Sequence, residues 1–321
     1  MIFKRAHLTQ PKQFLVESVE AAPGEGQMLI RVASCGLCNW ELNHWKGIIV
    51  PKKGYPLTLG HEYAGTVVEL GSGVTKFQVG DPVAVLGNMV GFAEYCVCNE
   101  SRAIKLEDSI DPKYVLGEPL KCIVTVLDAA APEPGDYGVI LGCGPMGQWC
   151  IQALAGNLLA GLIAIDIDDA KLDMAKQFGA TAVINSKREN VMERLKEITN
   201  GHLADFVIEG TGIPALFNEA QNYLRNSGRG RLILMSAHEA ITKDFDFRIL
   251  IQKGADVFAP HPSHSIDQMD DFRRAIALVN NGTFRVKELI SHEFKLSQIQ
   301  QAFETLENKP AGYIKGIVCP D

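Results

Sequence analysis

A glycine-rich turn at residues 142–147 has the residue types and spacing of a phosphate-binding loop. It follows the apolar run Val139-Ile140-Leu141 and reads Gly-Cys-Gly-Pro-Met-Gly. The first glycine permits a tight turn from strand to helix, the second lets a phosphate approach the backbone, and the third lets the helix pack closely on the sheet. The N-terminus of that helix then supplies an anion site, so the turn predicts a pyrophosphate cradle. Its expected cofactor-binding residues are Gly142, Gly144, Pro145, Met146 and Gly147.

A carboxylate follows this turn at the distance expected for a dinucleotide site. Asp166 ends the apolar run 162–166 and lies 24 residues after Gly142. At the carboxyl end of a buried strand, this carboxylate can accept hydrogen bonds from the hydroxyls of an adenosine ribose. It would repel a 2′-phosphate, and residues 167–169 add two acids and no arginine. The sequence therefore predicts NAD rather than NADP.

Three short segments carry side chains that could meet at one metal ion. They are Cys35-Gly36-Leu37-Cys38, Gly60-His61-Glu62 and Gly117-Glu118-Pro119-Leu120. Thiolate, imidazole and carboxylate together suit zinc, and three protein ligands leave a position open for substrate. A lone histidine or a buried cysteine is more often structural, but the order of these segments before a dinucleotide motif favours metal binding.

The apolar runs predict two kinds of domain that would position these residues. Up to about residue 115, short β-type runs at 27–32, 63–70 and 82–86 are separated by glycine turns. From about residue 120 to 260, helices alternate with apolar runs, which predicts one doubly wound parallel sheet. Its expected strands are 138–141, 162–166, 181–184, 205–209 and 231–235.

Two further helical regions complete the predicted α/β fold. In the crossover helix 171–178, the apolar residues Leu172, Ala175 and Phe178 share one face. The tail is expected to form a helix at 269–280, a strand at 288–294 and a second helix at 296–306, and to fold back onto the first, β-rich domain.

Composition limits the classes of partner. The 321 residues and an apolar fraction of 46% suit about two packed domains. A net charge of −7 without a basic block argues against nucleic acid or an anionic membrane as partner. No apolar run approaches the roughly 18 residues of a membrane helix, so a cytoplasmic protein is expected. The eight cysteines lack the spacing of a disulfide scaffold, and Cys96-x-Cys98 does not complete a zinc ribbon with Cys35-x-x-Cys38.

Taken together, these segments resemble the zinc-dependent medium-chain dehydrogenases, the family of alcohol, sorbitol and threonine dehydrogenases. The resemblance covers nearly the whole chain and rests on residues 35–41, 59–65, 79–83 and 118–120 besides the glycine motif. It implies a GroES-like catalytic domain at 1–118, a Rossmann NAD-binding domain at 119–260, and a C-terminal segment at 261–321 that returns to the catalytic domain. It also implies a homodimer or homotetramer.

The resemblance assigns roles to the candidate metal residues. Cys38 and His61 correspond to zinc ligands, Glu118 takes the third-ligand position, and Glu62 is the nearby acid that can enter or leave the coordination sphere. A glutamate at 118 is similar to the polyol and threonine branch of the family. Glu41 can orient the ligand imidazole through a hydrogen bond.

Two features depart from the family pattern. The lobe with four closely spaced cysteines is missing, so one catalytic zinc and no structural zinc are expected. Beside Cys38, the usual hydroxyl and histidine of a proton relay are absent, because the chain has Trp40 and Asn43 there and His44 one position later. Glu62 or Glu118, acting through a zinc-bound water, is therefore the expected proton acceptor. Trp40 is left as an apolar wall, a surface for a sugar ring, or a packing residue.

These observations predict a zinc-dependent NAD(H) oxidoreductase that interconverts a secondary alcohol of the polyol, sugar or cyclitol type and its ketone. Zinc would act as a Lewis acid while the carbinol hydride passes to nicotinamide in a cleft between the domains. His238, His261 and His264 are further candidates for contacts with hydroxyls or phosphate. Two alternatives stay open: a zinc-free quinone or enoyl-type reductase on the same fold, and a non-catalytic NAD-binding module.

Overall fold

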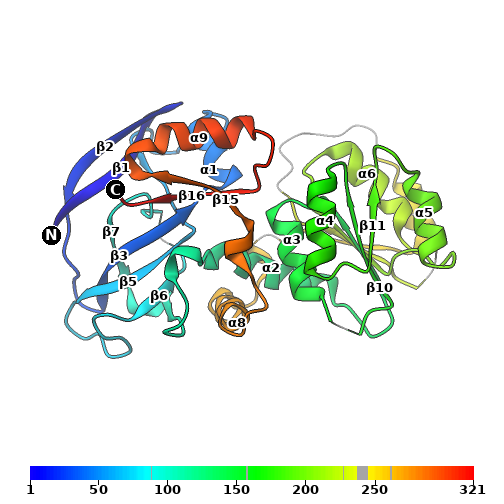
Figure 1. Ribbon diagram of the computed structural model, residues 1–321, viewed down its shortest axis with the longest axis horizontal. Coiled ribbons are helices and arrows are strands. Elements are labelled where there is room, and N and C mark those ends of the chain that lie inside the picture. Colours follow the sequence, from blue (N-terminus) through cyan, green and yellow to red (C-terminus); the bar gives the residue numbers. More distant parts are fainter. Residues whose placement is uncertain (88, 157, 227, 237–244, 261) are drawn as a thin grey trace. The chain divides into compact units, whose positions relative to one another are not determined.

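The computed structural model describes residues 1–321 except 88, 157, 227, 237–244 and 261, and it contains two compact units (Figure 1). Unit 1 comprises Met1–Lys121 and Phe272–Asp321, whereas unit 2 comprises Cys122–Asp271. The two ends of the sequence therefore build one unit. Among the described residues, no helix is long and apolar enough to cross a membrane.

Unit 1 is rich in β-structure. Its larger sheet has the strand order β15-β16-β3-β5-β6-β8, with β7 also paired to β3, and a smaller sheet has the order β2-β1-β4. The strands are β1 Ile2–Gln10, β2 Gln13–Glu20, β3 Gln27–Gly36, β4 Leu57–Thr58, β5 Tyr63–Leu70, β6 Pro82–Val85, β7 Tyr95–Asn99, β8 Ala103–Lys105, β15 Ile290–Lys295 and β16 Lys315–Cys319. The helices are α1 Asn39–Trp45, α8 Gln268–Asn280, which begins in unit 2, and α9 Ile299–Asn308.

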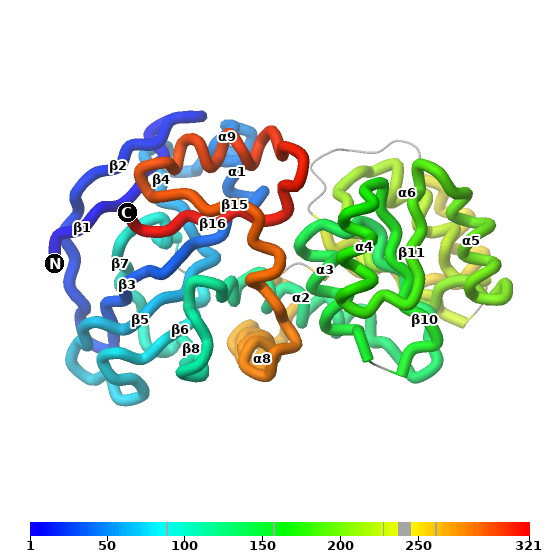
Figure 2. The backbone as a smooth tube through the Cα atoms, viewed as in Figure 1, coloured from blue at the N-terminus to red at the C-terminus, as the bar shows by residue number. Residues whose placement is uncertain are grey.

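The C-terminal segment of unit 1 belongs to the same core as its N-terminal strands. Strand β16 pairs antiparallel with β3, matching Ile317 to Gly36, and Figure 2 shows the two strands side by side. Helix α9 buries Phe303 against the rings of Phe14, Trp45 and Phe92. Burying an aromatic side chain of this size contributes about 3–5 kcal/mol, so the tail stabilises the unit that holds its first residues.

Unit 2 confirms the predicted doubly wound sheet. All its strand pairs are parallel, in the order β11-β10-β9-β12-β13-β14. The strands are β9 Tyr137–Leu141, β10 Gly161–Asp166, β11 Ala182–Asn185, β12 Phe206–Glu209, β13 Arg231–Leu234 and β14 Asp256–Phe258. The helices are α2 Gly117–Ala130, which begins in unit 1, α3 Pro145–Leu154, α4 Asp169–Phe178, α5 Val191–Ile198, α6 Pro214–Tyr223 and α7 Phe247–Lys253.

The five predicted strands of unit 2 form close to their expected positions, whereas the sequence analysis did not predict the edge strand β14. The central strand β9 buries the run Val139–Leu141, as expected of a parallel strand covered on both faces. Helix α4 begins at Asp168, whose carboxylate accepts the N–H of Ala170, and it ends at Gly179 with a φ of +113°. Its buried face is Leu172, Ala175 and Phe178, as predicted.

Candidate active site

Three separate segments of unit 1 bring the predicted metal residues together. Cys38 lies directly before α1, His61 and Glu62 lie directly before β5, and Glu118 lies in the first turn of α2. The ligand atoms of Cys38, His61 and Glu62 all lie within 4.8 Å of one another. Glu118 extends this group, because its Oε2 lies 3.7 Å from Nε2 of His61.

Glu41 fixes the orientation of His61. One buried oxygen of Glu41 accepts the backbone N–H of Gly60 at 2.5 Å and lies 3.0 Å from Nδ1 of His61. This contact holds the proton of the neutral ring on Nδ1, which leaves Nε2 as the free electron pair. Nε2 is the nitrogen that faces Glu118.

The charged neighbours of His61 favour a positive charge at this site. Burial alone would lower the pKa of His61, but the Glu41 carboxylate and the Cys38 thiol outweigh burial and raise the pKa to about 12. Burial raises the pKa of the Cys38 thiol, while the His61 ring opposes that change. A bound metal ion would supply a positive charge next to the same carboxylate and thiol.

These residues fit a zinc ion. Cysteine, histidine and glutamate are the common protein ligands of zinc, and tetrahedral bonds of about 2.0–2.3 Å place donor atoms roughly 3.3–3.8 Å apart. The 3.7 Å between Nε2 of His61 and Oε2 of Glu118 falls in that range, and the other donor atoms lie within 4.8 Å of one another. Among the described residues, Cys38, His61 and Glu62 form the group of metal-binding side chains that converges in this way.

Two buried lysines beside this group were missed by the sequence analysis. Lys315, the first residue of β16, places Nζ 2.6 Å from Oε2 of Glu62 and donates to the carbonyl of Leu37 at 2.9 Å. Lys121 places Nζ 3.5 Å from Oε1 of Glu118. Burial alone would lower the pKa of Lys315, but the Glu62 carboxylate raises it, so the ammonium stays charged. The available sequence signal for Lys121 was its position as a charged residue within the apolar run that follows Glu118.

Trp40 lies beside the metal group, where it makes ring contacts with His61 and His44. Its indole is 43% exposed and stands edge-on to the ring of His61, with ring centroids 5.8 Å apart. It also contacts His44 at 4.3 Å between centroids. His44 is buried, and burial lowers its pKa. The exposed indole is therefore an apolar surface next to the metal group.

The glycine turn of unit 2 has the geometry of a phosphate cradle. Gly142 follows β9 with a φ of +95°, in the region that glycine favours. A Cβ at Gly147 would lie 2.1 Å from the carbonyl oxygen of Gly142, so only glycine allows helix α3 to approach the turn this closely. A Cβ at Gly144 would meet nothing within 4 Å, which leaves room for a ligand. Pro145 and Met146 form the first turn of α3, with Pro145 at its start.

Asp166 ends β10 beside this turn. One carboxylate oxygen accepts the N–H of Cys143 at 2.7 Å, and the other accepts the N–H groups of Ile167 and Asp168 at 2.7 and 3.0 Å. The side chain is thereby fixed next to the cradle, and the oxygen that accepts only the N–H of Cys143 keeps acceptor capacity for a ribose hydroxyl.

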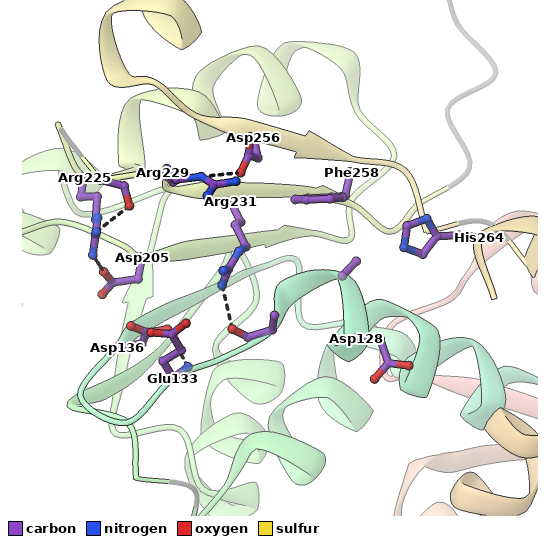
Figure 3. Close-up of a pocket in the computed structure, with 13 residues that line it drawn as sticks. Asp128, Glu133, Asp136, Asp205, Arg225, Arg229, Arg231, Asp256, Phe258 and His264 are labelled. Carbon is purple, nitrogen blue, oxygen red and sulfur yellow. Dashed lines mark hydrogen bonds and ion pairs between the residues drawn. The ribbon is translucent and has the colours of Figure 1, made fainter. Parts of the chain in front are cut away.

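Of the three additional candidate histidines, the described residues include His264. His238 and His261 lie outside the described residues. His264 lines a cavity of about 450 Å³ in unit 2, where its ring is 6.4 Å from that of Phe258 (Figure 3). Arg231 and Asp205 line the same cavity, but Arg231 already donates to the carbonyl of Ala130 at the end of α2, and Asp205 accepts a hydrogen bond from Arg225. Its arginines are committed to the fold.

Comparison with known proteins agrees with this geometry. Residues 24–108 match the model of the alcohol dehydrogenase GroES-like domain, and residues 145–281 match the model of the zinc-binding dehydrogenase domain. The chain belongs to the zinc-dependent medium-chain dehydrogenase family. The family members that it matches are dehydrogenases of alcohols, so this chain is an oxidoreductase of the alcohol dehydrogenase type.

The curated relatives match the chain over most of its length. A sorbitol dehydrogenase of Halalkalibacterium halodurans is 27% identical, with 95% of this chain and 94% of the relative covered. The (R,R)-butanediol dehydrogenase of Bacillus subtilis is 26% identical over 99% of this chain and 100% of the relative. A crystal structure of an Escherichia coli oxidoreductase/dehydrogenase of unknown specificity superposes with a TM-score of 0.88, at 25% identity over all of both chains.

Proposed function

We propose that the protein is a zinc-dependent, NAD(H)-linked dehydrogenase that interconverts a secondary alcohol and its ketone. The observation that carries the proposal is the convergence of Cys38, His61 and Glu62 beside Glu118, with Glu41 holding the imidazole so that Nε2 is available. The zinc-free reductase is disfavoured, because such an enzyme has no use for this donor set. A non-catalytic NAD-binding module would have no use for these donors either, so their convergence also disfavours that alternative.

The chain's own residues supply orientation and proton handling. Zinc at this site would contribute a Lewis acid that lowers the pKa of a substrate hydroxyl. Cys38, His61 and Glu118 would hold the metal, and Glu62 lies close enough to join them. Glu118 or Glu62 would receive the proton that the alcohol releases, since Trp40 has no group that relays one. The glycine turn and Asp166 would bind NAD, which accepts the hydride.

The relatives and the position of Trp40 support a polyol, sugar or cyclitol as the substrate. Sorbitol and butanediol dehydrogenases are the enzymes that the chain resembles over nearly its whole length. The exposed indole beside His61 offers an apolar face against which the C–H face of a polyol, sugar or cyclitol can pack. We therefore propose a secondary alcohol of this type.

The test is NADH formation by the purified chain with sorbitol, xylitol, myo-inositol and 2,3-butanediol. The proposal expects activity with at least one of these alcohols, its loss after treatment with a chelator, and its recovery with added zinc. The Glu118→Gln variant should lose activity, whereas Glu17→Gln, on strand β2, should keep it. Chelator-resistant reduction of a quinone or an enone would favour the zinc-free reductase instead.

A further inference from the structure

Two of the carboxylates beside the metal donors, Glu118 and Glu62, are each paired with a buried ammonium group. Lys121 lies one helical turn after Glu118 on α2 and is 1% exposed. Lys315 comes from the other end of the sequence, pairs with Glu62 at 2.6 Å and is also buried. Glu62 is 2% exposed, so its charge depends on this partner. Fully buried lysines are rare unless paired, and here two are paired at one site.

The charged side chains in contact at this site balance one divalent cation. Four of them are anions when a metal is bound: the Cys38 thiolate, Glu41, Glu62 and Glu118. The two lysines are cations, and His61 is neutral as a ligand. Two negative charges remain, which a divalent cation neutralises. Without the lysines, the same cation would leave a buried site with two negative charges, and such a site would bind the cation more tightly.

The two ammonium groups hold their carboxylates differently. Lys315 is fixed by two contacts, to Glu62 and to the carbonyl of Leu37, so it competes directly with a metal for Oε2 of Glu62. Lys121 lies 3.5 Å from Oε1 of Glu118, while Oε2 of the same carboxylate faces Nε2 of His61.

We propose that Lys121 and Lys315 are positioning residues that weaken and tune divalent-cation binding at this site by neutralising Glu118 and Glu62. The inference rests on the proposed function, because it takes these glutamates to lie at a zinc site. It goes beyond that function by assigning the affinity of the site to two lysines that contact the carboxylates and need not contact the metal.

The experiment measures zinc affinity of the metal-stripped full-length chain by competition with a chromophoric chelator. Lys121→Met and Lys315→Met should bind zinc at least about tenfold more tightly, because each removes a positive charge close to the cation. Lys121→Arg and Lys315→Arg keep the charge and should stay near the wild-type affinity. Lys253→Met is the matched control, since Lys253 is a partly buried lysine of unit 2 whose Nζ donates to the carbonyl of Asn222. Its zinc affinity should not change.

A merely structural role for the lysines would leave zinc affinity unchanged or weaken it, and that result in folded methionine variants overturns the proposal. If a methionine variant does not fold without metal, zinc should restore its thermal transition, because the cation replaces the lost charge. Failure of zinc to do so, in the methionine and in the Lys121→Gln and Lys315→Gln variants, also contradicts the proposal. A wild-type chain that binds no zinc overturns the proposed function as well, whereas zinc-dependent activity with unaffected lysine variants overturns only this inference.

Discussion

Glu41 determines which nitrogen of His61 is available to a metal. One carboxylate oxygen of Glu41 accepts the N–H of Gly60 and contacts Nδ1 of His61, and the side chain is fully buried. Glu41→Gln should keep an oxygen for these contacts but remove the negative charge, so zinc affinity should fall about 10- to 100-fold with little change in fold. Chelator competition measures this fall. Glu17→Gln, a substitution on β2, serves as the control, and equal affinities in all three proteins would show that Glu41 does not support the metal ligand.

Asp166 is the residue that should select between NAD and NADP. Its carboxylate is held beside the glycine turn by three backbone N–H groups. Asp166→Asn retains an acceptor for these groups and removes the charge that repels a 2′-phosphate, so the ratio of NADPH to NADH affinity should rise about tenfold or more. Titration of each reduced cofactor by fluorescence gives this ratio. An unchanged ratio would remove Asp166 from the account of cofactor choice.

At the residue scale, the family resemblance proposes the metal donors but not the lysines beside them. Cys38, His61 and Glu118 could be proposed from their positions in the family motifs, and the structure brings them close together. Lys315 could not, because its contact with Leu37 joins residues 278 positions apart, and nothing local to β16 indicates that its ammonium is buried. Lys121 gave a weaker signal, as a charge within the otherwise apolar run after Glu118.

The turn between β9 and α3 gives a paired prediction at the scale of one element. Gly147→Ala places a Cβ 2.1 Å from a carbonyl oxygen, so it should destabilise unit 2 by about 2–4 kcal/mol. Gly144→Ala meets no neighbour and has a φ of −68°, so its stability should stay within about 0.5 kcal/mol while NADH affinity falls. Urea unfolding and NADH titration separate the two effects. Equal stability of both variants would contradict the close packing of α3 on the turn.

Asp205, which directly precedes β12, accepts the N–H of Tyr137 on the neighbouring parallel strand β9. We expect this carboxylate to make the stability of the protein depend on pH. Burial alone would raise its pKa, but the Tyr137 N–H, His202 and Arg225 outweigh burial and lower it below the usual value. A lowered pKa in the folded state contributes stability above the unfolded value near 3.8, and this stability is lost as pH falls through the folded pKa. Asp205→Asn should therefore destabilise the protein by about 1–3 kcal/mol at pH 7 and by less in acid.

The check for Asp205 is urea unfolding of both proteins at neutral pH and below pH 4. The difference in unfolding free energy between wild type and variant should shrink as the solution becomes more acidic. Asp173→Asn, at an exposed position of α4, should show no such trend. A constant difference would mean that Asp205 contributes through its shape and not through its charge.

Strands with continuous apolar runs could be predicted from the sequence, whereas strands in which polar residues interrupt the apolar ones could not. β9 and β10 are apolar and buried because helices cover both faces of a parallel sheet. The hairpin of β1 and β2 was missed, since polar residues interrupt both strands and much of β2 is exposed. The edge strand β14 has three residues, and β16 depends on pairing with β3 from the opposite end of the chain. Pairing over such a distance leaves no local pattern to detect.

At the scale of the whole molecule, the two proposed binding sites belong to different units. The proposed metal donors lie in unit 1, whereas the glycine turn and Asp166 lie in unit 2. Each unit has its own core, so loss of zinc should leave NADH bound, and loss of NADH should leave zinc bound. Cys38→Ser should lose zinc and keep its NADH affinity within about twofold. Gly144→Ala should keep zinc and bind NADH more weakly. Loss of both ligands in either variant would show that the two sites are energetically coupled.

The metal content of the purified full-length chain, determined by elemental analysis, tests the central claim most directly. The account predicts about one zinc per wild-type chain. It also predicts no zinc in Cys38→Ser and an unchanged content in Cys319→Ser, which alters a partly buried cysteine at the end of β16. A wild-type chain that carries no zinc and takes up none when zinc is added back would contradict the account.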